Sequence, residues 1–235
     1  MKTLFDKLVK TSTITSVQED VSYPAANLAH QFARVYYKST SFDDVITLMF
    51  DDQHSVNTFF FTYSNAASMT VRLYKWDGTL LVTKVCDCTY DSGAEYFDAV
   101  TARWATITAV SSVSDDLRIG AVEFGEAVDF PLPSANFVPM LDSKSTMEES
   151  DQGQVSFQYV EPRMKYGTKY QGVLKADYLA LLEMFKAVDR GHLWIDITEE
   201  DHSVYRPLYC VSNLIESGER ISERVTFSLT FTEAR

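Results

Sequence analysis

The sequence predicts a mainly β protein, and three observations support this expectation. Aromatic residues make up 13% of the 235 residues, whereas the chain holds only 9 Gly and 6 Pro. Aromatic and β-branched residues favour strands that pack through cross-strand pairs. Six strand-like runs follow one another in the first half of the chain, and one helical pattern occurs in the second half.

Turn residues separate the strand-like runs of the first half. These runs are residues 44–50, 57–63, 69–76, 79–88, 102–110 and 117–124. Many short strands with turn chemistry between them predict a β-sandwich. The clearest hairpin carries Asp77-Gly78 between two apolar runs, because this dipeptide supplies the positive φ angles of a tight two-residue turn.

A domain boundary is expected near residue 134. The stretch 125–145 contains Pro131, Pro133 and Pro139, and each proline fixes φ and removes a backbone donor. Regular strand pairing should therefore stop there. We expect one domain over residues 1–133 and a second over residues 134–235.

The second half predicts strands around one amphipathic helix. Residues 153–160 alternate as a half-buried strand does, and further strands are expected at 192–198, 204–211 and 222–232. The helix is expected at 175–190, with Asp177 as its N-cap and Gly191 after its end. Its apolar stripe consists of Tyr178, Leu181, Leu182, Phe185 and Val188. A helix lying on a small antiparallel sheet or split barrel is the expected assembly.

Charge and composition exclude several classes of function. The chain has 21 Lys and Arg against 33 Asp and Glu, a formal net charge of −12. Like charges repel, so we expect neither nucleic acid nor an anionic membrane surface as a partner. No stretch approaches the ~18 apolar residues of a membrane span, so membrane insertion is not expected. The odd set Cys86, Cys88 and Cys210 predicts no disulfide framework and folding in a reducing compartment.

No spacing motif for catalysis or metal binding occurs. The four histidines, His30, His54, His192 and His202, are scattered, and no phosphate-binding or nucleophile motif is present. Neighbouring carboxylates at Asp43-Asp44, Asp51-Asp52 and Asp115-Asp116 are interpreted as exposed turn residues, because adjacent side chains diverge. The prediction is a protein that is not an enzyme and has no cofactor and no metal.

The three tryptophans are the remaining candidates for a binding role. A tryptophan face beside a carboxylate can bind a sugar through stacking and directional hydrogen bonds. Trp104 and Trp194 lie inside strand patterns and are expected in the core. Trp76 borders the Asp77-Gly78 turn, so Trp76 and Asp77 are the candidate contacts to a ligand or partner.

Several segments, taken in order, resemble the galactose-binding-like jelly rolls of minor tail proteins of tailed, siphophage-like bacteriophages. The resemblance covers about residues 14–130. Its segments are Tyr23-Pro24-Ala25-Ala26-Asn27-Leu28, Tyr36-Tyr37-Lys38-Ser39, the strand at 45–50, the loop and strand at 64–73, and the closing strands at 102–107 and 119–125. Asp51-Asp52 stands where the family often has Leu-Gly, and Lys38 replaces the commoner Arg. The second half is similar in layout to the tail-tube-like split barrels of distal tail proteins.

The resemblance implies a fold, a function and a location. The fold would be an N-terminal galactose-binding-like jelly-roll sandwich plus a C-terminal tail-tube-like split β-barrel with one α-helix. The function would be that of a structural virion protein of the phage tail tip, made in the host cytoplasm, which forms a ring homo-oligomer with itself and binds neighbouring tail proteins. The alternative is a carbohydrate-binding module that recognises host surface glycans and serves host attachment.

Overall fold

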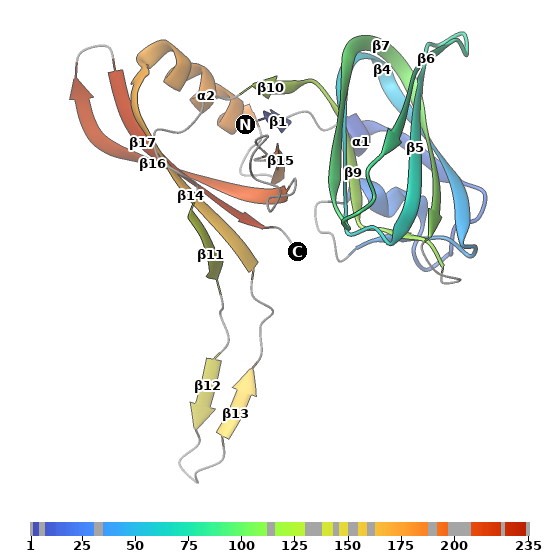
Figure 1. The fold of residues 1–235 in the computed structure, drawn as a ribbon, viewed down its shortest axis with the longest axis horizontal. Coiled ribbons are helices and arrows are strands. Elements are labelled where there is room, and N and C mark those ends of the chain that lie inside the picture. The colour runs from blue at the N-terminus through green and yellow to red at the C-terminus, as the bar shows by residue number, and fades with distance from the viewer. Residues whose placement is uncertain are drawn as a thin grey trace. The chain divides into compact units, whose positions relative to one another are not determined.

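The computed structural model divides the chain into two compact units. Unit 1 comprises Met1–Pro131 and Leu193–Tyr209, and unit 2 comprises Leu132–His192 and Cys210–Arg235. The structure describes residues 2–4, 8–30, 35–111, 116–129, 138–142, 146–149, 155–158, 163–187, 192–196, 208–221 and 224–233. The chain is mainly β, as predicted (Figure 1). The expected division into separately folding domains at residues 133 and 134 stays a prediction.

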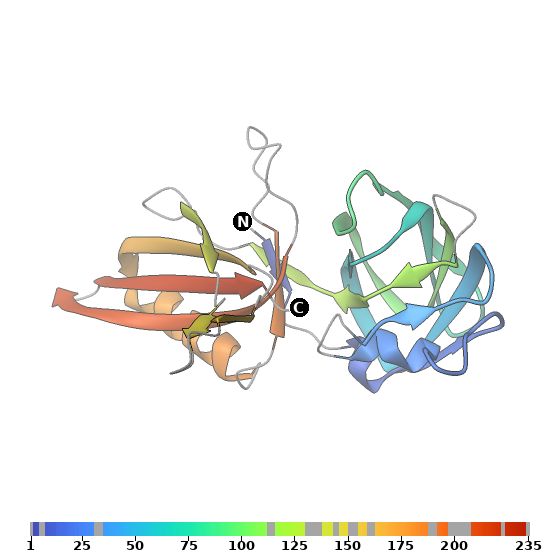
Figure 2. The same cartoon turned by 90° about the horizontal axis from the view of Figure 1, so that it is seen from below.

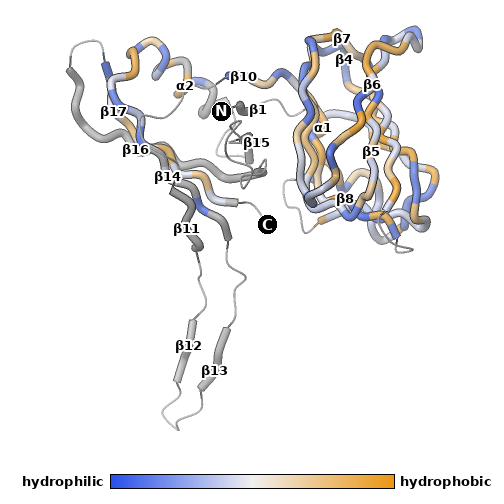
Figure 3. Tube along the Cα trace, viewed as in Figure 1, coloured by the Kyte–Doolittle hydropathy of each residue, from blue (hydrophilic) through white to orange (hydrophobic). Residues whose placement is uncertain are grey.

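Unit 1 contains most of the strands. Its elements are β1 (Lys2–Leu4), α1 (Leu8–Thr11), β2 (Thr13–Ser16), the 3-10 helix η1 (Ala25–Ala29), β3 (Tyr37–Lys38), β4 (Asp43–Thr62), β5 (Ala66–Tyr74), β6 (Leu80–Cys86), β7 (Gly93–Ser111), β8 (Arg118–Ile119), β9 (Ala121–Gly125), β10 (Ala127–Asp129) and, from much later in the chain, β15 (His192–Asp196). Hydropathy alternates along several of these strands, as one-sided burial requires (Figure 3).

The main strands of unit 1 form two layers. One layer has the order β2-β4-β7-β5-β6, and the other has the order β9-β4-β7. The long strands β4 and β7 belong to both layers, because their register shifts between the pairs Met49–Trp104 and His54–Ala102. Strands that change layer at such an irregularity make the corner of a β-sandwich. The predicted sandwich is therefore present in unit 1.

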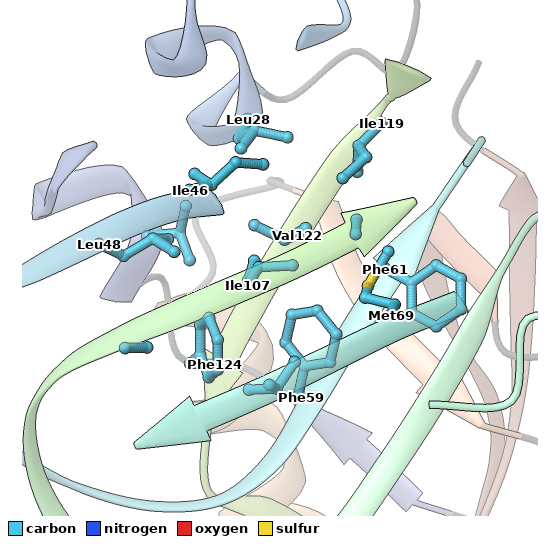
Figure 4. Packing of buried hydrophobic residues seen from close by; sticks show 14 of the residues in the cluster. Leu28, Ile46, Leu48, Phe59, Phe61, Met69, Ile107, Ile119, Val122 and Phe124 are labelled. Atoms are coloured by element: carbon cyan, nitrogen blue, oxygen red, sulfur yellow. The ribbon is translucent and has the colours of Figure 1, made fainter. Parts of the chain in front are cut away.

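The core of this sandwich lies between the two layers. Ile46, Leu48 and Ile107 come from the first layer and are 0% exposed, and they face Phe59 and Phe124 of the second layer, which are also 0% exposed (Figure 4). The aromatic rings contact each other directly, with ring centroids 4.8 Å apart for Phe59 and Phe124. The aromatic residues that predicted strand pairing therefore pack against one another in the core.

One side of the sandwich is closed by helical turns. The turns α1 and η1 contact β4, β9 and β2, and Figure 2 shows them in blue beside the strands. Val9, Ala25 and Leu28 from these turns are at most 1% exposed and belong to the core cluster. The buried Glu123 side chain accepts a hydrogen bond from the Val9 backbone at 2.9 Å, which ties α1 to β9.

Strands β10, β1 and β15 pair antiparallel in that order, and β1 and β15 pack on the outer face of the second layer. The Trp194 ring of β15 stacks on Phe60 with centroids 5.3 Å apart. Leu4 and Ala121 complete this cluster, and all four residues are at most 3% exposed. Burial of Trp194 confirms its predicted core position.

Unit 2 contains β11 (Val138–Asp142), β12 (Thr146–Glu149), β13 (Val155–Gln158), β14 (Arg163–Leu174), α2 (Lys175–Ala187), β16 (Leu208–Ile221) and β17 (Arg224–Glu233). Antiparallel pairing gives the order β16-β17-β14-β11, with β12 and β13 as a separate hairpin. The predicted alternation in the last strand is confirmed, since Val225, Phe227, Leu229 and Phe231 are all at most 5% exposed. The expected split barrel stays a prediction.

The helix of unit 2 begins at the expected residue, but its expected N-cap is wrong. It begins at Lys175, so Asp177 lies in its first turn and is not its N-cap. Tyr178 and Leu181 of the predicted stripe are buried, and the Tyr178 ring contacts Phe227 with centroids 5.2 Å apart. The side chains of Phe185 and Val188, and Gly191, lie outside the described residues. No helix in the described part of the chain is both long and apolar enough to span a membrane.

Candidate functional site

The two candidate contacts from the sequence lie at the β5–β6 hairpin. Trp76 is 77% exposed. Asp77 is used within the turn, because its Oδ1 accepts a hydrogen bond from the Thr79 backbone at 2.9 Å, and this bond lowers the pKa of Asp77. The Lys75 and Thr79 backbones pair at 2.9 Å, so the loop has three residues and the expected two-residue turn is wrong. Trp76 is therefore the side chain that the hairpin offers to a ligand.

Trp104 is not a core residue, contrary to the prediction. It pairs in register with Met49 and Tyr74, whose side chains face outward, and its ring stacks on Tyr74 with centroids 3.8 Å apart. Its Nε1 donates to the Lys75 carbonyl at 3.0 Å. The strand pattern was correct, but alternation alone does not say which face of a strand is buried.

The opposite end of the sandwich gathers five loops, which we name the loop end: residues 17–23, 36–42, 63–65, 87–92 and 116–118. Backbone hydrogen bonds tie these loops together. In each of these bonds the backbone N–H of the first residue donates to the carbonyl of the second: Asp20 to Lys38 at 2.9 Å, Ser39 to Leu117 at 2.9 Å, Ser64 to Asp91 at 2.8 Å and Asn65 to Arg118 at 3.2 Å. Strand β5 separates the loop end from the hairpin by about 25 Å at ~3.3 Å per residue.

A stacked tyrosine pair lies at the loop end. The rings of Tyr23 and Tyr36 are 4.7 Å apart at an interplanar angle of 13°. A hydrogen bond with Tyr23 is the main cause that raises the pKa of Tyr36. Both side chains are partly exposed, so the pair presents an aromatic surface with two hydroxyl groups beside it.

Charged groups lie next to this pair. Lys38 Nζ contacts Asp116 Oδ2 at 2.8 Å and Asp20 Oδ2 at 3.7 Å, and the bond to Asp116 is the main cause that raises the pKa of Lys38. The Lys38 backbone N–H donates to the Tyr23 carbonyl at 3.1 Å. The positive charges of Arg118 and Lys38 both act to lower the pKa of Tyr36. One lysine thus holds two carboxylates from different loops beside the tyrosines.

The Asn65 side chain holds the segment that carries Asp116 and Arg118. Its Nδ2 donates to the Asp116 carbonyl at 3.0 Å, and its Oδ1 accepts from the Arg118 backbone at 2.7 Å. Asn65 therefore fixes the segment that carries both charged residues. Tyr63, two residues before Asn65, has a φ of 52°, a conformation that bulky residues rarely adopt and that often marks a functional loop.

A buried polar cluster supports the loop end. Asp44 is 6% exposed and accepts short hydrogen bonds from the hydroxyls of Tyr37 and Ser16. Burial and the bond to Asp44 raise the pKa of Tyr37. The interpretation of Asp43-Asp44 as an exposed pair was wrong for Asp44, because β4 begins at Asp43 and its second side chain points inward.

Other sequence candidates show no reactive arrangement. Burial raises the pKa of the Cys88 thiol to about 11 and that of Cys86 further, so both thiols are protonated at neutral pH. Within the described residues, no three His, Cys, Asp or Glu side chains gather as a metal site. Asp115, like the side chains of Cys210, His192 and His202, lies outside the described set.

Sequence reasoning did not find the loop end as a site. Tyr23, Tyr36, Lys38, Asn65 and Asp116 lie in four separate loops, and no spacing motif connects them. The only signal was the resemblance to galactose-binding-like jelly rolls. It included the segments 23–28 and 36–39 but assigned them no role.

Comparisons with known proteins give structural neighbours only. No protein-family model and no curated protein sequence matches the chain. A family 32 carbohydrate-binding module of Clostridium perfringens, solved with GalNAc-β-1,3-galactose, has 10% identity and a TM-score of 0.45, covering 51% of this chain and 98% of its own. The module of NanJ from the same organism, solved with galactose, has 14% identity and a TM-score of 0.45 over 53% of this chain and 98% of its own.

A third neighbour is the lectin domain of lectinolysin, solved with Lewis b antigen. It has 10% identity and a TM-score of 0.45, covering 51% of this chain and 95% of its own. These three structures are binding modules, and the expected identity as a phage tail protein finds no support among them.

Proposed function

We propose that unit 1 is a carbohydrate-binding module that recognises a glycan at the loop end. The observation that carries this proposal is the stacked pair Tyr23–Tyr36 beside Lys38, Asp116 and Arg118. An aromatic face binds the apolar C–H face of a sugar ring, and charged groups around it bind the hydroxyls.

The groups at the loop end suit hydroxyl recognition. Lys38 uses two carboxylate partners and retains a third N–H donor, while each carboxylate oxygen accepts more than one hydrogen bond. The Lys38 ion pairs and the Asn65 bonds hold these groups in place before a ligand arrives, which reduces the entropy that binding would cost.

The test is calorimetric titration of the full chain with galactose, GalNAc-β-1,3-galactose and Lewis b tetrasaccharide. We expect saturable binding of at least one sugar, with a Kd on the order of 0.1–1 mM, typical of a small polar ligand on a shallow site. Tyr36→Ala should weaken binding about tenfold or more through loss of stacking. Tyr90→Ala is the matched control, because Tyr90 is 54% exposed at the same end and outside the pair.

The Trp76→Ala variant distinguishes the two ends of the sandwich. Unchanged binding supports the loop end. Loss of binding in Trp76→Ala, with Tyr36→Ala unaffected, would place the sugar at the exposed hairpin tryptophan and overturn the loop-end site. If none of the three sugars bound saturably, the proposal of a carbohydrate-binding module would be contradicted.

The expectation of a ring-forming virion protein in the phage tail stays a prediction. No contact among the described residues favours it over glycan binding. Immunogold electron microscopy of phage particles, with antibody against the recombinant protein, tests it directly. Label confined to the tail end would support it, and unlabelled particles would contradict it.

A further inference from the structure

The two sides of the unit 1 sandwich are closed to different degrees. On the side of β2 and β9, the turns α1 and η1 fill the space between the layers with Val9 and Leu28. The opposite side lies between β6, the last strand of the first layer, and the first half of β7, the last strand of the second layer. There the structure has an open groove of about 750 Å³.

Backbone edges line this groove. Its residues are Leu81, Val82, Thr83, Lys84, Tyr96, Phe97, Asp98 and Val100. Successive side chains of a strand point to opposite faces, so one strand face would contribute only alternate residues. Four consecutive residues of β6 line the groove, which means that the edge of the strand forms its wall.

The backbone groups on these edges lack strand partners in the described part of the chain. Strand β6 pairs with β5 alone. In β7 the register runs from Val56–Val100 to Thr58–Tyr96, so residues 97–99 lie opposite the single residue Asn57. Such a bulge leaves residues outside the hydrogen-bonded ladder. Both walls therefore offer backbone N–H and C=O groups to an extended chain.

The side chains give the groove a definite chemistry. Val82, Phe97 and Val100 are half-buried and pack against the core, forming an apolar floor. Lys84 pairs in register with the buried Val71, so its side chain points toward the layer interface. No ion pair of Lys84 occurs among the described residues, in a protein with 33 acidic residues and a net charge of −12.

We propose that this groove binds an extended peptide segment of a partner protein, which adds a strand to the edge of β6. Its alternate apolar side chains contact Val82, Phe97 and Val100, and one acidic side chain pairs with Lys84. Strand addition supplies affinity through the backbone, and the lysine supplies selectivity for an acidic residue. This site is independent of the loop end.

The test is a bead-bound heptapeptide library screened with the full-length protein. Retained peptides are expected to alternate apolar residues and to carry Asp or Glu at one fixed position. Hydrogen–deuterium exchange should then show slower exchange at residues 81–84 when a retained peptide is added. N-methylation of alternate peptide amides should weaken binding at least about tenfold, because it removes the backbone donors.

Charge exchange at Lys84 gives the sharper measurement. Lys84→Glu should weaken binding of the acidic peptide by about tenfold or more, and should favour the peptide with Lys in place of its acidic residue. Lys75→Glu is the matched control, since it makes the same charge change on the hairpin outside the groove. Circular dichroism is used to check that both variants are folded.

Several outcomes would overturn the proposal. One is a library that yields no retained peptide, and another is a retained peptide that leaves exchange at residues 81–84 unchanged. Equal effects of Lys84→Glu and Lys75→Glu would show that only net charge matters. Self-association of Lys84→Glu but not of the wild type would show that Lys84 keeps the edge of β6 unpaired and does not select a partner.

Discussion

At the residue scale, the cluster of Tyr37, Asp44 and Ser16 explains how the loop end is supported. Asp44 also accepts a hydrogen bond from the Val45 backbone at 2.6 Å, so its carboxylate is satisfied although it is buried. Tyr37 precedes Lys38 in β3 and is 0% exposed. The cluster therefore anchors the strand that carries the central lysine of the candidate site.

We predict that Tyr37→Phe lowers the free energy of unfolding by about 1–3 kcal/mol, because Asp44 loses a buried hydrogen-bond donor. Urea unfolding followed by fluorescence measures this change. Tyr90→Phe is the control, with a change within about 0.5 kcal/mol, since Tyr90 is 54% exposed. Equal stability of the two variants would show that the buried hydroxyl contributes nothing.

The thiols of Cys86, which is buried, and Cys88, which is half-buried, give a second prediction at this scale. The pKa of Cys88 is raised to about 11 by burial, so its thiol stays protonated in the folded protein at a pH where an unfolded cysteine ionises. In a Cys210→Ser background, the remaining cysteines should react with iodoacetamide at pH 8 about a hundredfold more slowly than in urea. Rapid labelling of native protein at pH 8 would contradict the burial of these residues.

The same raised pKa predicts a loss of stability at alkaline pH. The folded state favours the protonated thiol, so the contribution is complete below the unfolded pKa near 9 and is lost as pH rises through about 11. The midpoint of thermal unfolding should fall over this range in the Cys210→Ser protein. It should fall less in a variant that also carries Cys88→Ser, which has no thiol to ionise at this position.

At the element scale, two glycines are required for different physical reasons. A Cβ at Gly93, where β7 begins, would lie 2.6 Å from the Phe61 ring and 3.2 Å from the Asp87 carbonyl. Gly78 in the hairpin has open space around it but a φ of +84°. Close packing therefore excludes a larger side chain at Gly93, whereas the backbone conformation disfavours one at Gly78.

We predict that Gly93→Ala lowers the free energy of unfolding by about 1–3 kcal/mol through overpacking, and Gly78→Ala by about 1 kcal/mol through backbone strain. A double-mutant cycle with Phe61→Leu separates the causes. Coupling should exceed about 0.5 kcal/mol for Gly93→Ala and be absent for Gly78→Ala. Equal coupling at both positions would contradict the packing explanation.

Local patterns predicted strands well where one face is buried throughout. The runs at 69–76 and 79–88 became β5 and β6, and the hairpin between them was found at its correct position. Residues 44–50 and 57–63 were predicted as two strands because alternation breaks at the layer change, yet they form the single strand β4. The first half of β7 was missed because its bulge at 97–99 interrupts the alternation.

The candidate site is less accessible to such reasoning than the strands. Alternation records burial within one strand, whereas the loop end depends on which loops meet after the layers have packed. Asp116 lies far along the chain from Lys38, and only their 2.8 Å contact shows that they lie side by side. Trp76 was found because exposure at a turn is a local property.

At the scale of the whole molecule, unit 1 is not continuous in sequence. Leu193–Tyr209 belongs to it although the intervening segment forms unit 2. Strand β15 pairs with β1, so Leu4 and Trp194 lie opposite each other over Phe60. The outer face of the second layer is thus covered by a segment that a division at residue 134 would remove.

We therefore predict that a chain ending at Pro131 is markedly less stable than the full chain, because Phe60 and Leu4 lose the cover of Trp194. Trp194→Ala in the full chain should reproduce most of this loss, at about 3–5 kcal/mol for a buried aromatic residue. Thermal unfolding and binding of a fluorescent apolar dye measure both changes. If Phe60→Ser in the shortened chain abolishes dye binding and improves solubility, the exposed surface is the one covered by β15. A shortened chain as stable as the full chain would show instead that the sandwich folds without its distant strand.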